Sequence, residues 1–245
     1  MAADLASLRA LLFDLDGVVT PTAALHMRAW SRLFNTFLAA HGHAADYSDD
    51  DYYAYVDGKP RYDAVRAVMA SRGIPLPEGT AADPPEADTV NGLGLRKNAA
   101  FVAELTEYGI EAFPGSVRFL DAAVAAGYRT ALVSSSRNAV PVIEAAGVHD
   151  RFEVVVDGIV GAAQSLAGKP APDTFLTAAR MLDVPPSECA VLEDAIAGVQ
   201  AGRAGGFGLV VGVNRGAGEQ TLLREGADIV VDDLAELLPR LRSGS

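Results

Sequence analysis

The sequence predicts an α/β fold: a doubly wound parallel core sheet of the Rossmann-like kind, with an inserted helical cap domain. Six short runs are apolar almost throughout, as strands buried on both faces of a sheet are. Most of these runs alternate with segments of helical character, and that alternation is typical of a parallel sheet flanked by helices. After the first run, a long stretch contains helical segments only, which indicates an insertion into the core.

The predicted strands are rich in aliphatic residues and several end at polar side chains. They cover residues 9–15, 128–134, 152–157, 188–193, 207–213 and 228–231. Between them, helices are predicted where small or apolar residues share one face and a glycine or proline lies near the end. These segments are 116–127, 138–147, 171–182 and 195–205.

The inserted stretch contains helical patterns at 25–42, 60–73 and 94–109. We therefore assign residues 1–20 and 110–245 to the core domain and residues 21–109 to a helical cap domain. The two connections run near 19–22 and 108–115, and two short linkers are what a hinged cap requires. Residues 75–92 are rich in proline, glycine and acidic residues and are predicted to form a loop.

Composition excludes several classes of function. The formal net charge is -12 and there is no cluster of basic residues, which argues against a general nucleic-acid binder and fits an acidic, soluble surface. The single cysteine, Cys189, excludes an intrachain disulfide and lies in an apolar run. No apolar run reaches the roughly 18 residues of a membrane helix, and the N-terminus lacks signal-peptide features, so we expect a cytoplasmic protein.

Polar side chains follow the predicted strands at the edge where open parallel sheets bind ligands, the carboxyl ends of the strands. Asp14 and Asp16 follow the first strand, and Glu193 and Asp194 come at the end of the fourth strand. A serine run that begins at Ser134 follows the second strand, and Lys169 lies in a loop before a helix.

Converging carboxylates are costly to bury unless a divalent cation such as Mg²⁺, with a phosphate beside it, balances their charge. Asp14 and Asp16 point the same way from an extended strand end, so one can attack phosphorus while the other handles a proton. Lys169 would hold the nucleophile and neutralise charge, and the Ser134 hydroxyl would donate to a phosphoryl oxygen. Each signal alone is weak, but the four in this order predict phosphoryl transfer.

Four segments resemble the motifs of the haloacid dehalogenase superfamily: DLDGVVT (14–20), LVSSS (132–136), GKPAPDTF (168–175) and VLEDAIAGVQAGRAG (191–205). The resemblance implies that Asp14 is the nucleophile that forms an aspartyl-phosphate and that Asp16 is the general acid and base. It also implies Mg²⁺ held by Asp14, the Asp16 backbone carbonyl and Asp194, with Glu193 close by. The dehalogenase branch itself is disfavoured, because its chemistry needs neither a metal nor Asp16.

Further segments are similar to the β-phosphoglucomutase subgroup of that superfamily: TPTAALHMRAW (20–30), GKPRYD (58–63), RKN (96–98) and SSSRN (134–138). This resemblance assigns Thr22 and His26 to the neighbourhood of the general acid and base. It assigns Arg61 to the non-reacting phosphate and Lys97 to the sugar. The residues it assigns to the distal phosphate are Ser136, Arg137 and Asn138.

The resemblance thus implies a Mg²⁺-dependent mutase that interconverts β-glucose 1-phosphate and glucose 6-phosphate. β-Glucose 1,6-bisphosphate would be its intermediate and activator, and a second phosphate site formed by Arg61, Arg137 and Ser136 would hold this bisphosphate. Two alternatives stay open: a sugar-phosphate phosphatase on the same scaffold, and a non-catalytic sugar-phosphate sensor. The complete set of Asp14, Asp16, Lys169 and Asp194 weakens the sensor.

The sequence departs from the subgroup at two places. Pro21 stands where the subgroup commonly has an acidic residue, which stiffens the linker and removes a carboxylate. The loop at 75–92 looks longer than in compact members and belongs to the cap. For partners, we expect a monomer that binds a small phosphorylated sugar, without nucleic acid or membrane.

Overall fold

The computed structural model describes residues 4–44 and 46–242, and its core is a six-stranded sheet in which all five neighbouring pairs are parallel. The strands are β1 (Ala10–Phe13), β2 (Arg129–Val133), β3 (Val154–Val156), β4 (Cys189–Glu193), β5 (Leu209–Val213) and β6 (Ile229–Val231). Their order is β3-β2-β1-β4-β5-β6. The predicted doubly wound fold is confirmed, and the direction of winding reverses between β1 and β4, where such sheets bind their ligands.

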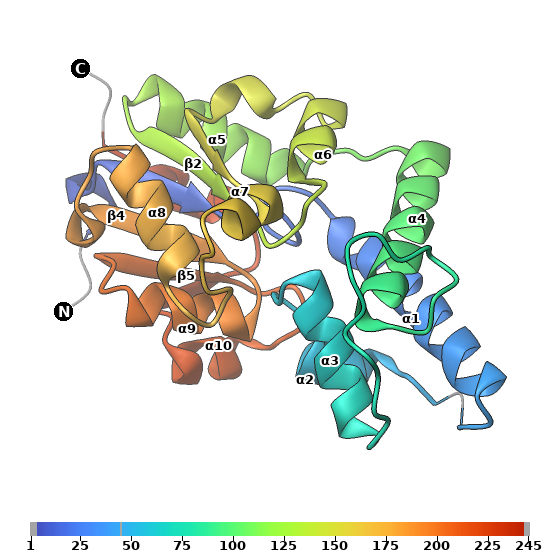
Figure 1. Cartoon of the computed structure of the whole chain (residues 1–245). Coiled ribbons are helices and arrows are strands. Elements are labelled where there is room, and N and C mark those ends of the chain that lie inside the picture. The colour runs from blue at the N-terminus through green and yellow to red at the C-terminus, as the bar shows by residue number, and fades with distance from the viewer. Residues whose placement is uncertain (1–3, 45, 243–245) are drawn as a thin grey trace. The chain divides into compact units, whose positions relative to one another are not determined.

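Helices cover both faces of this sheet (Figure 1). They are α5 (Pro114–Ala125), α6 (Ala139–Ala145), α7 (Gly158–Ala163), α8 (Asp173–Met181), α9 (Ile196–Ala204) and α10 (Glu219–Glu225). Short 3-10 helices are η1 (Leu5–Ser7), η2 (His149–Arg151), η3 (Pro186–Glu188) and η4 (Leu234–Arg240). Successive side chains of β1 face opposite ways, as in any strand. Leu12 packs in the cluster that contains Phe175 of α8, whereas the Phe13 ring contacts Phe119 of α5.

The chain divides into two compact units. One contains the sheet and comprises the chain up to Pro21 and from Ile110 onward; the other is Thr22–Gly109. The second unit is helical, with α1 (Thr22–Ala40), α2 (Asp49–Tyr55), α3 (Arg61–Ser71) and α4 (Val90–Tyr108). It has its own apolar core, in which the rings of Trp30 and Phe34 stack with centroids 5.1 Å apart. No helix among the described residues is long and apolar enough to cross a bilayer.

The structure contains elements that the sequence patterns did not predict. Helices α2, α7 and α10 are short, so their apolar residues give little periodic signal. Helix α4 begins at Val90, inside the stretch predicted as a loop, because the Thr89 side chain accepts a hydrogen bond from the Gly92 amide at 3.0 Å and caps the helix. The predicted loop is therefore shorter than expected at its carboxyl end.

Candidate active site

Asp14 lies directly after β1 and is 6% exposed. Its amide donates to the Leu192 carbonyl at 2.9 Å, which continues the pairing of β1 with β4 beyond the strand. Its Oδ1 accepts a hydrogen bond from Lys169 Nζ, across 155 residues of sequence. Both the backbone amide and the side chain of Asp14 are thus held by hydrogen bonds, at the place between β1 and β4 where the direction of winding of the sheet reverses.

Lys169 lies in the loop before α8, and its side chain is 1% exposed. Besides Asp14, its ammonium donates to Glu193 Oε1 at 2.7 Å and to the Val133 carbonyl at 3.3 Å. An ammonium has three protons to donate, and here each has an acceptor, from the ends of β1, β4 and β2. The structure thus brings Lys169 and Asp14, two of the predicted site residues, into direct contact.

The charged groups of this cluster shift one another's pKa. Burial raises the pKa of Asp14 well above its usual range, and the Lys169 ammonium acts in the opposite direction. Desolvation lowers the pKa of Lys169, but the carboxylates of Asp14 and Glu193 outweigh it and raise that pKa above its usual range. Lys169 therefore stays charged, and its ammonium favours the ionised form of Asp14 against the effect of burial, which favours the protonated form.

Three carboxylates meet at this point. Ligand oxygens of Asp14, Glu193 and Asp194 all lie within 4.8 Å of one another. Three negative charges against the single positive charge of Lys169 leave an excess of two, which a divalent cation would balance. Carboxylate oxygens are the ligands that Mg²⁺ prefers in proteins, so the residues present fit that ion.

Gly17 allows Asp194 to approach the turn that follows Asp16. Its φ of +82° lies in the left-handed region, and a Cβ built on it would be 1.8 Å from Asp194 Oδ2. Any side chain at this position would therefore displace Asp194. Sequence reasoning did not single out Gly17, although it stands inside the quoted motif DLDGVVT.

Glu193 is positioned from two sides. Its Oε2 accepts the Ala195 amide at 2.8 Å while its Oε1 accepts Lys169. Gly198, on the first turn of α9, leaves the space for this side chain, because a Cβ there would lie 1.7 Å from Glu193 Oε1. Gly198 was likewise not singled out by the sequence, and its role becomes visible only when the helix is packed on the strand end.

We expect Gly198→Ala to lower turnover by tenfold or more, on the order of what a displaced active-site group costs, and to destabilise the fold by about 1–3 kcal/mol. The added methyl would push Glu193 away from Lys169. Steady-state kinetics and urea unfolding measure the two effects. The matched control is Gly161→Ala in α7, where a Cβ meets nothing within 4 Å. Equal kinetics for both variants would contradict the role of Gly198.

Ser134 follows β2 and is 2% exposed. Its Oγ accepts the Ser136 amide at 3.0 Å, and Ser136 Oγ in turn accepts the Asn138 amide at 3.1 Å. Because Ser134 follows Val133, whose carbonyl binds Lys169, it lies next to the cluster. Arg137, in the same loop, is exposed.

The predicted residues of the helical unit form two contacts within that unit. Lys97 is 2% exposed, and its Nζ lies 2.5 Å from His26 Nδ1 and over the Phe101 ring at 4.8 Å. Arg61 Nη2 donates to Asn98 Oδ1 at 2.7 Å. Asn98 was quoted in the RKN motif without a role, and only the helix geometry pairs it with Arg61. Thr22 is buried at the first position of α1.

His26 is expected to make stability depend on pH. Burial, and then the charges of Lys97 and Arg61, lower its pKa well below the usual value. In the unfolded chain the imidazole protonates at about pH 6.5, so below that pH the unfolded state binds a proton that the folded state does not. The free energy of unfolding should therefore decrease as the pH is lowered through about 6.5, by at most about 1.4 kcal/mol per pH unit.

Urea unfolding between about pH 7 and about pH 5 checks this expectation through the window given by the unfolded pKa. The wild type should lose stability more steeply than His26→Gln as the pH falls. His41 titrates in both proteins, so the difference in slope belongs to His26. Parallel slopes for wild type and His26→Gln would contradict the expectation.

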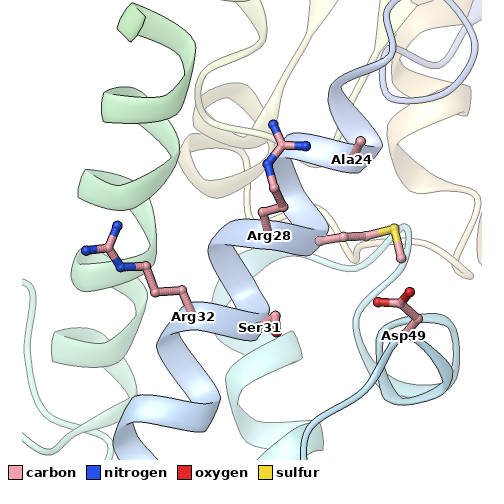
Figure 2. A pocket seen from close by; sticks show the side chains of 6 residues that line it. Ala24, Arg28, Ser31, Arg32 and Asp49 are labelled. Carbon is pink, nitrogen blue, oxygen red and sulfur yellow. The ribbon is translucent and has the colours of Figure 1, made fainter. Parts of the chain in front are cut away.

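A separate hollow of about 490 Å³ lies on the helical unit. Figure 2 shows Arg28, Ser31 and Arg32 along α1, with Asp49 of α2 beside them. The lining residues are Ala24, Met27, Arg28, Ser31, Arg32 and Asp49. None of them is a predicted site residue, both arginines are exposed, and Arg28 pairs with Glu104 at 3.1 Å. We assign this hollow no part in the chemistry.

Comparison with known proteins bears on the whole chain. Over 240 residues it is 49% identical to the β-phosphoglucomutase of Mycobacterium bovis, a match that covers 94% of this chain and 91% of that protein. Among solved structures, β-phosphoglucomutase from Clostridium difficile has a TM-score of 0.75 at 27% identity, covering 94% of this chain and 93% of its own. CbbY from Rhodobacter sphaeroides, in complex with xylulose-(1,5)bisphosphate, has a TM-score of 0.71 at 26% identity, covering 96% and 100%.

The family model of the haloacid dehalogenase-like hydrolases matches residues 8–206, which contain all four of the motifs quoted from the sequence. The resemblance that those motifs carry is therefore confirmed, and so is the prediction of an enzyme. The chain belongs to the haloacid dehalogenase-like hydrolase family of enzymes.

Proposed function

We propose that this enzyme transfers a phosphoryl group through Asp14 and interconverts β-glucose 1-phosphate and glucose 6-phosphate. The observation that carries the proposal is the buried Asp14 carboxylate, which Lys169 binds beside Glu193 and Asp194. The choice of sugar is supported by the near-full-length match to a β-phosphoglucomutase.

Mg²⁺ would be held by Asp14, the Asp16 backbone carbonyl and Asp194, and it would neutralise charge on the transferring phosphoryl group. Glu193 has a different part in this proposal. Both of its oxygens already accept hydrogen bonds, from Lys169 and from the Ala195 amide. We therefore assign Glu193 chiefly to holding Lys169, next to the metal.

The first half-reaction starts from Asp14 that carries a phosphoryl group. Asp16 takes the proton from the sugar 6-hydroxyl, whose oxygen attacks phosphorus, and the bond from phosphorus to the Asp14 oxygen breaks. The products are β-glucose 1,6-bisphosphate and free Asp14. Lys169 neutralises charge on the transferring group, and Ser134 donates to one of its oxygens.

The second half-reaction requires the bisphosphate to bind in the opposite orientation. Asp14 attacks the phosphorus at C1, the bond from phosphorus to the sugar oxygen breaks, and Asp16 returns its proton to that oxygen. Glucose 6-phosphate leaves and Asp14 is phosphorylated again. Thr22 and His26 would orient Asp16 for these proton transfers. Binding in two orientations needs a second phosphate site, which we assign to Arg61, Ser136, Arg137 and Asn138, with Lys97 for the sugar.

A sugar-phosphate phosphatase is the second candidate, because the same aspartyl-phosphate can be hydrolysed by water. The structure of CbbY with xylulose-(1,5)bisphosphate supports the phosphatase as a candidate, since that relative binds a bisphosphorylated sugar. A phosphatase that acts on a bisphosphate would also use a second phosphate site.

The deciding assay supplies the purified protein with β-glucose 1-phosphate, Mg²⁺ and a trace of β-glucose 1,6-bisphosphate, and follows glucose 6-phosphate and inorganic phosphate separately. A mutase produces glucose 6-phosphate with little phosphate release. Phosphate release without glucose 6-phosphate would overturn the mutase in favour of the phosphatase. Binding of the sugar phosphate without any turnover would support the sensor.

We expect Arg61→Ala to lower mutase activity by about 10²-fold, since a charge-assisted contact to a phosphate is worth about 1.5–3 kcal/mol and its loss also misorients the bisphosphate. A phosphatase acting on a monophosphate should lose much less. The control is Arg32→Ala, an exposed arginine of the same helical unit. A wild-type rate in Arg61→Ala would remove Arg61 from the site.

A further inference from the structure

Arg215 follows β5, and its side chain reaches the turn that follows Asp16, the proposed general acid and base. Its Nε donates to the Gly17 carbonyl at 2.8 Å, and its Nη1 donates to the Asp232 carbonyl at 2.9 Å. In the sheet, β4 lies between β5 and β1, so the side chain links the end of β5 to the residue that follows Asp16 across the position of β4. No motif in the sequence pointed to this arginine.

The turn after Asp16 is anchored through three successive carbonyls. Besides Gly17, the Val18 carbonyl accepts from Ser116 Oγ at 2.6 Å, and the Val19 carbonyl accepts from the Phe113 amide at 2.9 Å. The Arg215 guanidinium also lies over the Phe113 ring, with its carbon 4.0 Å from the centroid. Two of the three anchors are therefore packed against each other.

Gly17 is the position of this turn whose backbone is least restricted by its own side chain. It has the widest backbone freedom of the turn and adopts a left-handed φ of +82°. Its preceding peptide contains the Asp16 carbonyl, and its following peptide contains the carbonyl that Arg215 holds. The Gly17 amide, which belongs to the first of these peptides, donates to the Thr20 carbonyl at 2.8 Å. Arg215 adds a hold on the second peptide, so that both peptide planes around Gly17, and with them the orientation of Asp16, are fixed.

Asn214 strengthens the other end of the bridge. Its Nδ2 donates to Asp232 Oδ1 at 3.0 Å, and its amide donates to the Val231 carbonyl at 2.8 Å. These two bonds fix the loop that carries Arg215 to the end of β6, independently of the contact between the guanidinium and the Gly17 carbonyl. A side chain held at its base in this way loses less conformational freedom when it binds a carbonyl.

We propose that Arg215 is a positioning residue for phosphoryl transfer, which holds the turn at 17–19 through the Gly17 carbonyl and the Phe113 ring and thereby orients Asp16 and its backbone carbonyl. The inference rests on the proposed function at Asp14 and Asp16. It assigns no contact with the substrate to Arg215.

The test compares Arg215→Met with a matched arginine at the other end of the sheet. Arg242 makes the same kinds of contact where β2 begins: its Nε donates to the Ala126 carbonyl at 2.8 Å, its Nη2 donates to the Gly127 carbonyl, and its guanidinium lies over the Tyr128 ring. Arg242→Met therefore removes equivalent interactions away from the carboxyl ends of the strands.

Arg215→Met is expected to lower kcat about 10- to 100-fold, as about 1 Å of misplacement does, with KM for β-glucose 1-phosphate changed by less than about threefold. Binding of Mg²⁺ alone, measured by calorimetry, should weaken, and the amides of residues 17–20 should exchange hydrogen about tenfold faster or more. Arg215→Lys, which keeps one donor, should recover part of each effect. Arg242→Met should keep kcat within about twofold of wild type.

A loss of kcat in Arg215→Met no larger than in Arg242→Met, or unchanged exchange at 17–20, would overturn the proposal. If Arg215→Met does not fold, Arg215→Lys carries the same measurements. A wild type without any turnover would refute the proposed function instead, and the exchange and Mg²⁺ binding would still decide whether Arg215 holds the turn.

Discussion

Asp14→Asn is expected to abolish turnover of β-glucose 1-phosphate, with a fall in kcat on the order of 10⁴-fold or more. An amide oxygen is a far weaker nucleophile than a carboxylate, so no phosphoryl group reaches the side chain. The fold should persist, because asparagine has the same shape and Lys169 keeps its bond to Glu193. Thermal unfolding checks the fold, and kinetics check the loss.

Covalent labelling makes the same experiment more specific. The wild type, incubated with β-glucose 1,6-bisphosphate and quenched in acid, should carry one phosphoryl group on the peptide that contains Asp14, and Asp14→Asn should carry none. The control is Asp157→Asn, a buried aspartate after β3 whose Oδ1 accepts the Ile159 and Val160 amides, which an asparagine oxygen can also do. A phosphoryl group retained in Asp14→Asn would assign the nucleophile to another residue.

Lys169→Met is expected to reduce both activity and stability. Without the ammonium, the carboxylates of Asp14 and Glu193 stay buried without their cation, and breaking a buried ion pair in this way costs about 3–5 kcal/mol. The activity should fall on the order of 10³-fold, since the group that neutralises the transferring phosphoryl is gone. Urea unfolding without Mg²⁺ measures the stability.

Mg²⁺ should restore part of the stability that Lys169→Met loses. A cation that binds only the folded state stabilises it by mass action, by about 2.7 kcal/mol at one hundred times its Kd. The gain should be larger in the variant than in the wild type, because the variant has one more uncompensated negative charge. Lys59→Met, in the other Lys-Pro pair of the chain, should show the wild-type gain. A Mg²⁺ effect no larger in Lys169→Met than in wild type would contradict a metal site beside Lys169.

Much of the fold was predictable because its signals are local. The six apolar strand runs and the helical segments between them read correctly, since burial on both faces leaves a continuous apolar run in the sequence. The helices that were missed are short or begin at a cap: α2 opens on a capping box between Ser48 and Asp51, within an acidic segment that has little apolar periodicity. Such helices depend on a few polar contacts that periodicity does not detect.

The sequence by itself indicated which residues carry the proposed chemistry. A parallel sheet brings the carboxyl ends of its strands to one edge, so Asp14, Lys169 and Glu193 could be expected to meet from their positions after strands and before a helix. These residues meet because the strands are parallel, and the alternation of strands and helices in the sequence predicts that parallel arrangement. The family membership followed from the same motifs.

Only the tertiary structure decided which residues hold that chemistry in place. Gly198 leaves room for Glu193, Gly17 leaves room for Asp194, and Arg215 holds the Gly17 carbonyl from 198 residues away. An absent methyl group and a bond to a backbone carbonyl leave no pattern in the sequence, because they depend on distances between segments rather than on the order of residues within one. Asp14 and Lys169 can therefore be predicted as site residues from the sequence alone, whereas the contacts that orient them become visible only after the strands are packed side by side.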